Sequence, residues 1–216
     1  LVRWSKPDQK TNSFFNYGSS MEETNTANPR YATLNKDYAA EMASISTEDD
    51  GPIWMVNLMK YRETAEYGDS QEVTISGEEA DNLYAPIEIL SDIGAEIVFI
   101  GDVEMQLLGD ATQWDRVAVV KYPTRRSFVE MSLRKDFQEK HVHKEAGMQK
   151  TIVMGCVPME TPTYERTDWT EVENPPSKID GAITVVHVLQ LNEHIEKMDN
   201  YSLIAGESAI PNGVHI

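Results

Sequence analysis

Residues 53–59 read Ile-Trp-Met-Val-Asn-Leu-Met, an apolar run with the length of one buried β-strand. After a loop, Ser76 and Glu79 have the spacing of a capping box, which marks the start of a helix. Apolar residues then recur at helical spacing up to Leu90, and Pro86 is expected to kink this helix. This part of the chain therefore predicts a strand followed by a helix.

The remaining elements continue the pattern to residue 157. We expect strand 97–107 with a bulge at Gly101, strand 114–122, a helix opened by Pro123 and Thr124, a further helical stretch at 136–147, and strand 151–157. The order strand, helix, strand, strand, helix, strand is that of a ferredoxin-like unit. We therefore predict an α+β fold in which both helices cover the same face of one antiparallel sheet.

Several of these strands are apolar on both faces. Residues 97–100 and 117–120 are continuous apolar runs, and successive side chains of a strand point to opposite faces. A sheet with helices on one side only shows alternation, because its other face meets water. We therefore expect the second face to be covered as well, most simply by another copy of the sheet in a homodimer or a tandem pseudo-dimer.

The sequence outside this unit divides into three further parts. We assign an N-terminal arm and helix to residues 1–50, the ferredoxin-like α/β-barrel domain to 51–157, a linker rich in Pro, Thr and Glu to 158–180, and a partial second ferredoxin-like repeat to 181–216. The N-terminal helix is expected to start at Asn28 and Pro29, a cap residue followed by proline at the first helical position.

The second repeat is inferred from a short internal similarity. Residues 55–61 align with residues 185–191, so a strand is expected there too. Too few residues follow Asp180 for a complete second unit. We therefore expect the chain to be a fragment of a longer tandem protein; the alternative is a tail that completes a neighbour's sheet.

Composition excludes several classes of protein. The chain of 216 residues has 19 basic and 36 acidic residues, a formal net charge of −17, which disfavours binding to nucleic acid. No uncharged apolar run approaches the roughly 20 residues needed to cross a bilayer, so no membrane span is predicted. Cys156 is the only cysteine, so no intrachain disulfide forms. A cytoplasmic location is expected, and a secreted one stays open.

Five short motifs carry a resemblance to a known family. They are Asn57-Leu58-Met59-Lys60-Tyr61, Gly77-Glu78-Glu79-Ala80, Gly101-Asp102-Val103, Trp114-Asp115-Arg116-Val117 leading to Tyr122-Pro123-Thr124-Arg125, and His141-Val142-His143-Lys144-Glu145-Ala146-Gly147. Over residues 53–157 the chain resembles a bacterial family of unknown function in the dimeric α/β-barrel superfamily. The resemblance implies ferredoxin-like units that pair sheet to sheet into a barrel. That superfamily includes cofactor-free monooxygenases, lactone isomerases, haem enzymes and stress-response proteins, so the resemblance selects no chemistry and no catalytic residues.

A candidate ligand site combines aromatic residues with a few polar ones. Its predicted members are Asn57, Tyr61, Tyr84, Asp102, Trp114 and His141. Aromatic walls with a few polar groups suit a small, mostly apolar ligand, although ordinary core packing would use the same residues. Asn57 interrupts an otherwise apolar strand, where its amide would either anchor a ligand or make a structural hydrogen bond.

The histidines do not predict a metal site. His141 and His143 are two residues apart on a predicted helix, which places them about 200° apart around its axis. His141 and Glu145 have a chelating spacing, but no third ligand is identifiable. The sequence also has no phosphate-binding glycine loop, no Gly-x-Ser-x-Gly and no Cys-x-x-Cys. We therefore predict neither a metal nor a cofactor.

Two functions fit these observations. The first is a protein that binds a small, mostly apolar molecule and acts as a cofactor-free enzyme of the monooxygenase or isomerase type. The second is a non-catalytic dimerisation or assembly module, because no complete catalytic constellation is visible. Neither the substrate nor the catalytic residues follow from the sequence.

Overall fold

The computed structural model describes residues 2–3, 29–68, 74–158, 177 and 184–189. The chain divides into two compact units, residues 4–157 and a second unit formed by residues 1–3 and 158–216. The second unit contains the two-residue strand β1 (Val2–Arg3). Residues 184–189 form no strand, although one was expected there. Most of the predicted linker and second repeat lies outside the described residues, so those boundaries stay predictions.

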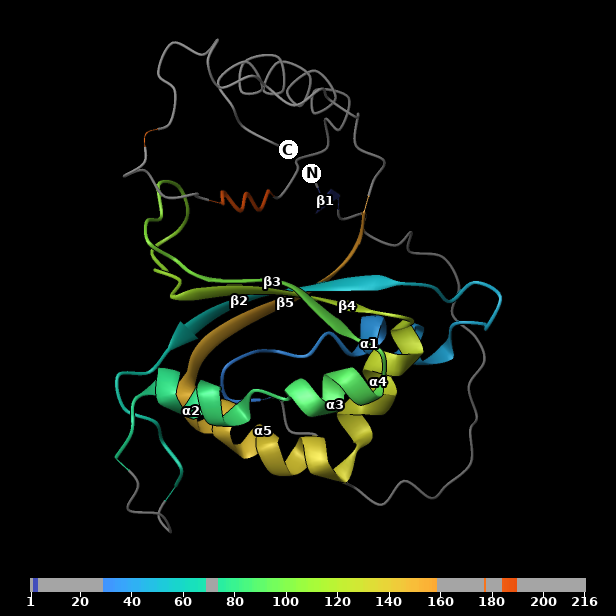
Figure 1. Cartoon of the computed structure of the whole chain (residues 1–216), viewed down its shortest axis with the longest axis horizontal. Coiled ribbons are helices and arrows are strands. Elements are labelled where there is room, and N and C mark those ends of the chain that lie inside the picture. Colours follow the sequence, from blue (N-terminus) through green and yellow to red (C-terminus); the bar gives the residue numbers. More distant parts are fainter. Residues whose placement is uncertain (1, 4–28, 69–73, 159–176, 178–183, 190–216) are drawn as a thin grey trace. The chain divides into compact units, whose positions relative to one another are not determined.

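The larger unit contains an antiparallel sheet with the strand order β5-β2-β4-β3. The strands are β2 (Ile53–Tyr61), β3 (Glu96–Asp102), β4 (Arg116–Tyr122) and β5 (Met148–Pro158). The helices are α1 (Lys36–Ser44), α2 (Gly77–Tyr84), α3 (Ile87–Asp92), α4 (Arg125–Leu133) and α5 (Lys135–Gly147). All five lie on one face of the sheet (Figure 1). The predicted ferredoxin-like α+β fold is therefore confirmed.

Alternation along β2 places apolar side chains on both faces of the sheet. Ile53 and Met55 face the helices, where they share a buried core with residues of α1, α3, α4 and α5. Val56 and Leu58 point to the opposite face and are 7% and 8% exposed. Burial on both faces explains why β2 is a continuous apolar run. Among the described residues there is no second sheet, so sheet-to-sheet pairing stays a prediction.

Proline and a polar loop shorten two predicted elements. The helix expected up to Leu90 is interrupted, not kinked, because α2 ends at Tyr84 and α3 begins after Pro86. The strand expected at 97–107 ends at Asp102, and Met105 beyond it is 70% exposed. The bulge in β3 lies between Ile97 and Phe99, so the prediction of a bulge at Gly101 was wrong.

The N-terminal helix starts later than its sequence signal suggested. Asn35 is its cap, and its side chain accepts a hydrogen bond from the backbone N–H of Tyr38 at 3.1 Å. Pro29 therefore does not begin the helix, and Asn28 lies outside the described residues. Tyr31 consequently lies in a segment that is free to run along β5, where its carbonyl accepts a hydrogen bond from Thr151 N–H at 3.1 Å.

A close backbone contact joins α2 to α5. The carbonyl of Gly147 accepts a hydrogen bond from Arg62 N–H (2.9 Å), and the Arg62 carbonyl accepts one from Gly77 N–H (3.0 Å). Ala80 and Ala146 close the contact and are 0% and 1% exposed. These small residues let the two helices approach more closely than larger side chains would allow.

In the described part of the chain, no helix is long and apolar enough to cross a membrane.

Gly147→Ala should destabilise the fold. A Cβ at this position would lie 2.5 Å from the Gly77 carbonyl oxygen and 2.9 Å from the Ala80 Cβ. Overpacking of this kind costs about 1–3 kcal/mol in the free energy of unfolding, measured by urea denaturation. Gly51→Ala is the control, because its added Cβ would meet no atom within 4 Å. Equal stabilities of the two variants would contradict the steric role of this contact.

Candidate functional site

The side chain of Lys144 is buried between two tyrosine rings. Lys144 is 8% exposed, and its Nζ lies 5.0 Å from the ring centre of Tyr84 and 6.0 Å from that of Tyr31. Within the described residues, Nζ forms neither an ion pair nor a hydrogen bond. Desolvation lowers the pKa of Lys144, and the negative charge of Asp81 opposes this effect only in part. The amine is therefore shifted toward its neutral form.

His141 lies one turn before Lys144 on α5 and faces the same tyrosines. Its Nε2 is 3.1 Å from the Tyr31 hydroxyl oxygen, and its ring centre is 6.0 Å from that of Tyr84. Its Nδ1 is buried and has no hydrogen-bond partner within the part of the chain that the structure describes. Burial lowers the pKa of His141, and the protonated form of Lys144 lowers it further, so the neutral imidazole is favoured. In either tautomer one hydrogen-bonding position of this ring is unused.

Asp81 connects the lysine to a second group of polar residues. Its Oδ2 accepts a hydrogen bond from the Tyr61 hydroxyl at 2.8 Å and lies 3.6 Å from Arg116 Nη1. Arg116 Nε donates to Asp102 Oδ1 at 2.7 Å, and its guanidinium lies 5.5 Å from the Tyr61 ring centre. Burial and the Asp81 charge raise the pKa of Tyr61, so its hydroxyl stays protonated and donates.

Helical spacing and the contact between the two glycines account for this assembly. His141 and Lys144 are three residues apart on α5, and Asp81 and Tyr84 are three apart on α2, so each pair shares one helix face. The close approach of α2 to α5 turns these faces toward each other. Tyr31 completes the set from the segment beside β5. We call Tyr31, Asp81, Tyr84, His141 and Lys144 the Lys144 cluster.

Four of the six predicted ligand-binding residues lie in or beside this cluster. Tyr84 and His141 belong to it, and Tyr61 and Asp102 reach it through Asp81 and Arg116. Their role in ligand binding stays a prediction.

The other two predicted residues have other contacts. The Asn57 Nδ2 donates to the Met55 carbonyl in its own strand at 3.0 Å, which is the structural hydrogen bond considered above. The Trp114 ring lies under Lys150 Nζ, 5.4 Å from its centre.

Sequence reasoning missed the residue at the centre of the cluster. Lys144 stands in a helix whose sequence is almost entirely polar, so no apolar stripe marks its buried face. Its spacing of three from His141 was the available signal, because it places both side chains on one face. Asp81 and Tyr84 have the same spacing of three residues on α2, which places both on one face of that helix.

The second histidine of α5 has different neighbours. His143 Nδ1 is 2.8 Å from the Tyr67 hydroxyl, whereas His141 contacts Tyr31. The two rings therefore point to different partners, as their spacing predicts. In the region that the structure describes, no group of at least three His, Cys, Asp or Glu side chains could hold a metal ion.

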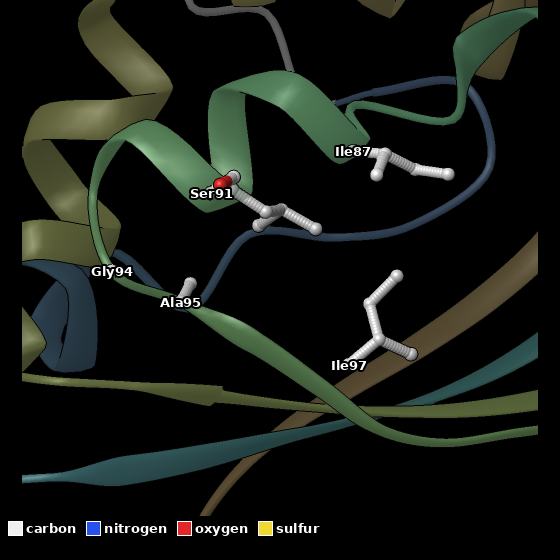
Figure 2. A pocket seen from close by; sticks show the side chains of 6 residues that line it. Ile87, Ser91, Gly94, Ala95 and Ile97 are labelled. Carbon is white, nitrogen blue, oxygen red and sulfur yellow. The ribbon is translucent and has the colours of Figure 1, made fainter.

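A separate groove lies between α3 and β3 (Figure 2). It has a volume of about 340 Å³ and is lined by Ile87, Leu90, Ser91, Gly94, Ala95 and Ile97. Ile87 and Ile97 point into it from opposite walls and are 61% and 39% exposed. No residue of the Lys144 cluster and none of the predicted ligand-binding residues lines this groove.

Comparisons with known proteins identify structural relatives without an assigned activity. No family model matches the chain, and no curated protein matches it. A crystal structure of the methylated RPA0582 protein aligns with a TM-score of 0.54 and 26% identity, covering 62% of this chain and 99% of that one. A second structure, of the RPA0582 protein of unknown function from Rhodopseudomonas palustris, aligns with a TM-score of 0.52, 26% identity and coverage of 61% and 98%. The predicted resemblance to bacterial proteins of unknown function is therefore confirmed.

Proposed function

We propose that this protein binds a small, mostly apolar molecule with one polar group at the Lys144 cluster and acts on it as a cofactor-free enzyme. The observation that carries the proposal is the amine of Lys144, which is buried beside two tyrosine rings without an ion pair in the described structure. Buried lysines without a partner are rare, and strongly perturbed ionisable groups concentrate at functional sites.

Energetics supports a ligand at this position. An unpaired buried polar group costs about 1–3 kcal/mol, and within the described residues His141 Nδ1 is in this situation beside the desolvated amine of Lys144. One polar group of a ligand could supply the missing hydrogen bonds. The rings of Tyr31, Tyr84 and Phe137 around these atoms offer apolar contacts to the rest of the molecule.

The cluster supplies groups for proton transfer. A neutral lysine amine can accept a proton from a substrate, and the contact between Tyr31 and His141 can carry a proton to or from a second atom. Moving a proton between two positions of one molecule needs no cofactor. Of the two predicted enzyme types, the isomerase-like reaction is the one that these side chains support best.

A second candidate function is assembly with another chain through the edge of the sheet, a different contact from the sheet-to-sheet pairing predicted for the homodimer. The observation that favours it is the edge of β3, where Ile97, Val98 and Ile100 are 39%, 43% and 56% exposed. In the described sheet, β3 has a neighbour only on its β4 side. Unpaired apolar edges promote pairing with other chains.

The assembly alternative predicts a dimer that a charge on this edge disrupts. Val98→Lys should shift the molar mass, measured by light scattering, from dimer to monomer, because edge lysines oppose strand pairing. Leu107→Lys is the control, since Leu107 is 81% exposed and lies outside β3. A monomeric wild-type protein would remove the support for this alternative.

The buried amine should make stability depend on pH. The folded-state pKa of Lys144 is below its unfolded value of about 10.4, so the unfolded chain binds more protons between the two values. The free energy of unfolding should therefore rise with pH across this window, up to about pH 9.5, below the ordinary pKa of tyrosine. Urea denaturation at several pH values measures this rise.

Lys144→Met should flatten the dependence of the free energy of unfolding on pH. The variant should be at least as stable as the wild type near neutral pH, because methionine has a similar length to lysine and lacks the desolvated amine. Lys150→Met is the matched control, since Lys150 is exposed and hydrogen-bonds Thr112 Oγ1 at 2.8 Å. Superimposable profiles for the wild type and Lys144→Met would contradict a lowered pKa.

Ligand binding should depend on Lys144. A panel of phenols and small lactones, screened by ligand-observed NMR, is expected to contain binders. Their dissociation constants should rise about tenfold in Lys144→Met, the equivalent of one lost hydrogen bond, and stay unchanged in Lys150→Met. A panel without binders, or affinities that are equal in both variants, would count against the proposed site.

A further inference from the structure

Among the described residues, Lys144 is the only buried lysine or arginine. Other lysines of this region have charged or polar partners: Lys60 Nζ is 2.8 Å from Asp115 Oδ1, and Lys150 bonds Thr112. An exposed lysine is protonated near neutral pH, and a protonated amine has no lone pair for bond formation. The amine of Lys144 differs from these because it is desolvated and no carboxylate of the described residues contacts it directly.

The lowered pKa of Lys144 increases the share of its amine that is neutral, and a neutral amine is a nucleophile as well as a base. Lysines activated by an apolar pocket form Schiff bases with carbonyl substrates. The two tyrosine rings beside Nζ provide that surrounding, and the nearest acidic influence, Asp81, is already engaged by the hydroxyl of Tyr61 and by Arg116. The hydrogen bonds of Asp81 are thus made to other groups, and its charge opposes the lowered pKa of Lys144 only in part.

We infer that the substrate class of the Lys144 cluster is an aldehyde or ketone with an apolar body, and that Nζ forms an imine with its carbonyl carbon. This inference rests on the proposed function and deepens it. Nζ attacks the carbonyl carbon to form a carbinolamine, with a proton moving from nitrogen to oxygen. The hydroxyl group then takes up a proton and leaves as water while the nitrogen lone pair forms the C=N bond, and the nitrogen releases its remaining proton to give the neutral imine. Amine and carbonyl thus give imine and water, with no oxidant or reductant.

The pair of Tyr31 and His141 is suited to the proton transfers of this step. The hydroxyl of Tyr31 belongs to the ring beside Nζ and is 3.1 Å from His141 Nε2. A proton released by nitrogen can move to this pair and return to the departing oxygen. The unused Nδ1 of His141 gives the pair a second position for hydrogen bonding.

Reductive trapping tests the inference on the full chain. The protein is incubated near neutral pH with benzaldehyde or hexanal and sodium cyanoborohydride, which reduces an imine to a stable secondary amine. Peptide mass mapping is expected to find one adduct, on the peptide with Lys144, formed at least about tenfold faster than on exposed lysines, because those are protonated at this pH. Lys144→Met should lose this adduct and Lys150→Met should keep it, with circular dichroism as the check that both variants are folded.

Binding of benzyl alcohol separates this inference from the proposed function. This probe has the shape of benzaldehyde but forms no imine. If Lys144-dependent binding of benzyl alcohol is seen by NMR while neither aldehyde labels Lys144, the imine is wrong and the binding site stands. If labelling is spread over exposed lysines and benzyl alcohol does not bind, both are wrong. Selective labelling of Lys144 in the wild-type protein supports both.

Discussion

The arrangement of this protein depends on the close approach of two backbones where α2 meets α5. Gly77 and Gly147 lack the Cβ atoms that would keep the helices apart, and Arg62 links them with backbone hydrogen bonds. Because α2 begins and α5 ends at this point, the first turns of α2 run beside the last turns of α5. Asp81 is thereby brought near Lys144, and a sequence-distant pair becomes one electrostatic unit.

Much of the fold could be predicted because its signals are local. The capping box of Ser76 and Glu79 is present, and β2 covers the apolar run that suggested it. The order of elements follows from hydrophobic spacing and needs no knowledge of distant contacts. Boundaries were less predictable where two local signals compete, as for Asn28 and Asn35, both of which can cap a helix.

The site was less predictable than the fold, because burial of a polar residue is decided by tertiary contacts. In α5 the sequence offers several charged side chains, and only the packing of α2 and Tyr31 determines that Lys144 is the buried one. Asn57 shows the opposite case. Its polarity in an apolar strand suggested a ligand anchor; in the structure its Nδ2 donates to a carbonyl two residues away, and the ligand role stays a prediction. Polarity alone therefore identified neither residue's role.

The ion pairs of Arg116 link a buried carboxylate to a solvent-exposed one. Asp102 is 70% exposed and shares this guanidinium with the largely buried Asp81, which in turn acts on Lys144. Dissolved salt screens the exposed carboxylate far more than the inner one. Ionic strength therefore changes how strongly Arg116 interacts with its exposed partners Glu78 and Asp102 relative to Asp81. The proton affinity of an amine with almost no contact to water is consequently sensitive to the composition of the medium outside.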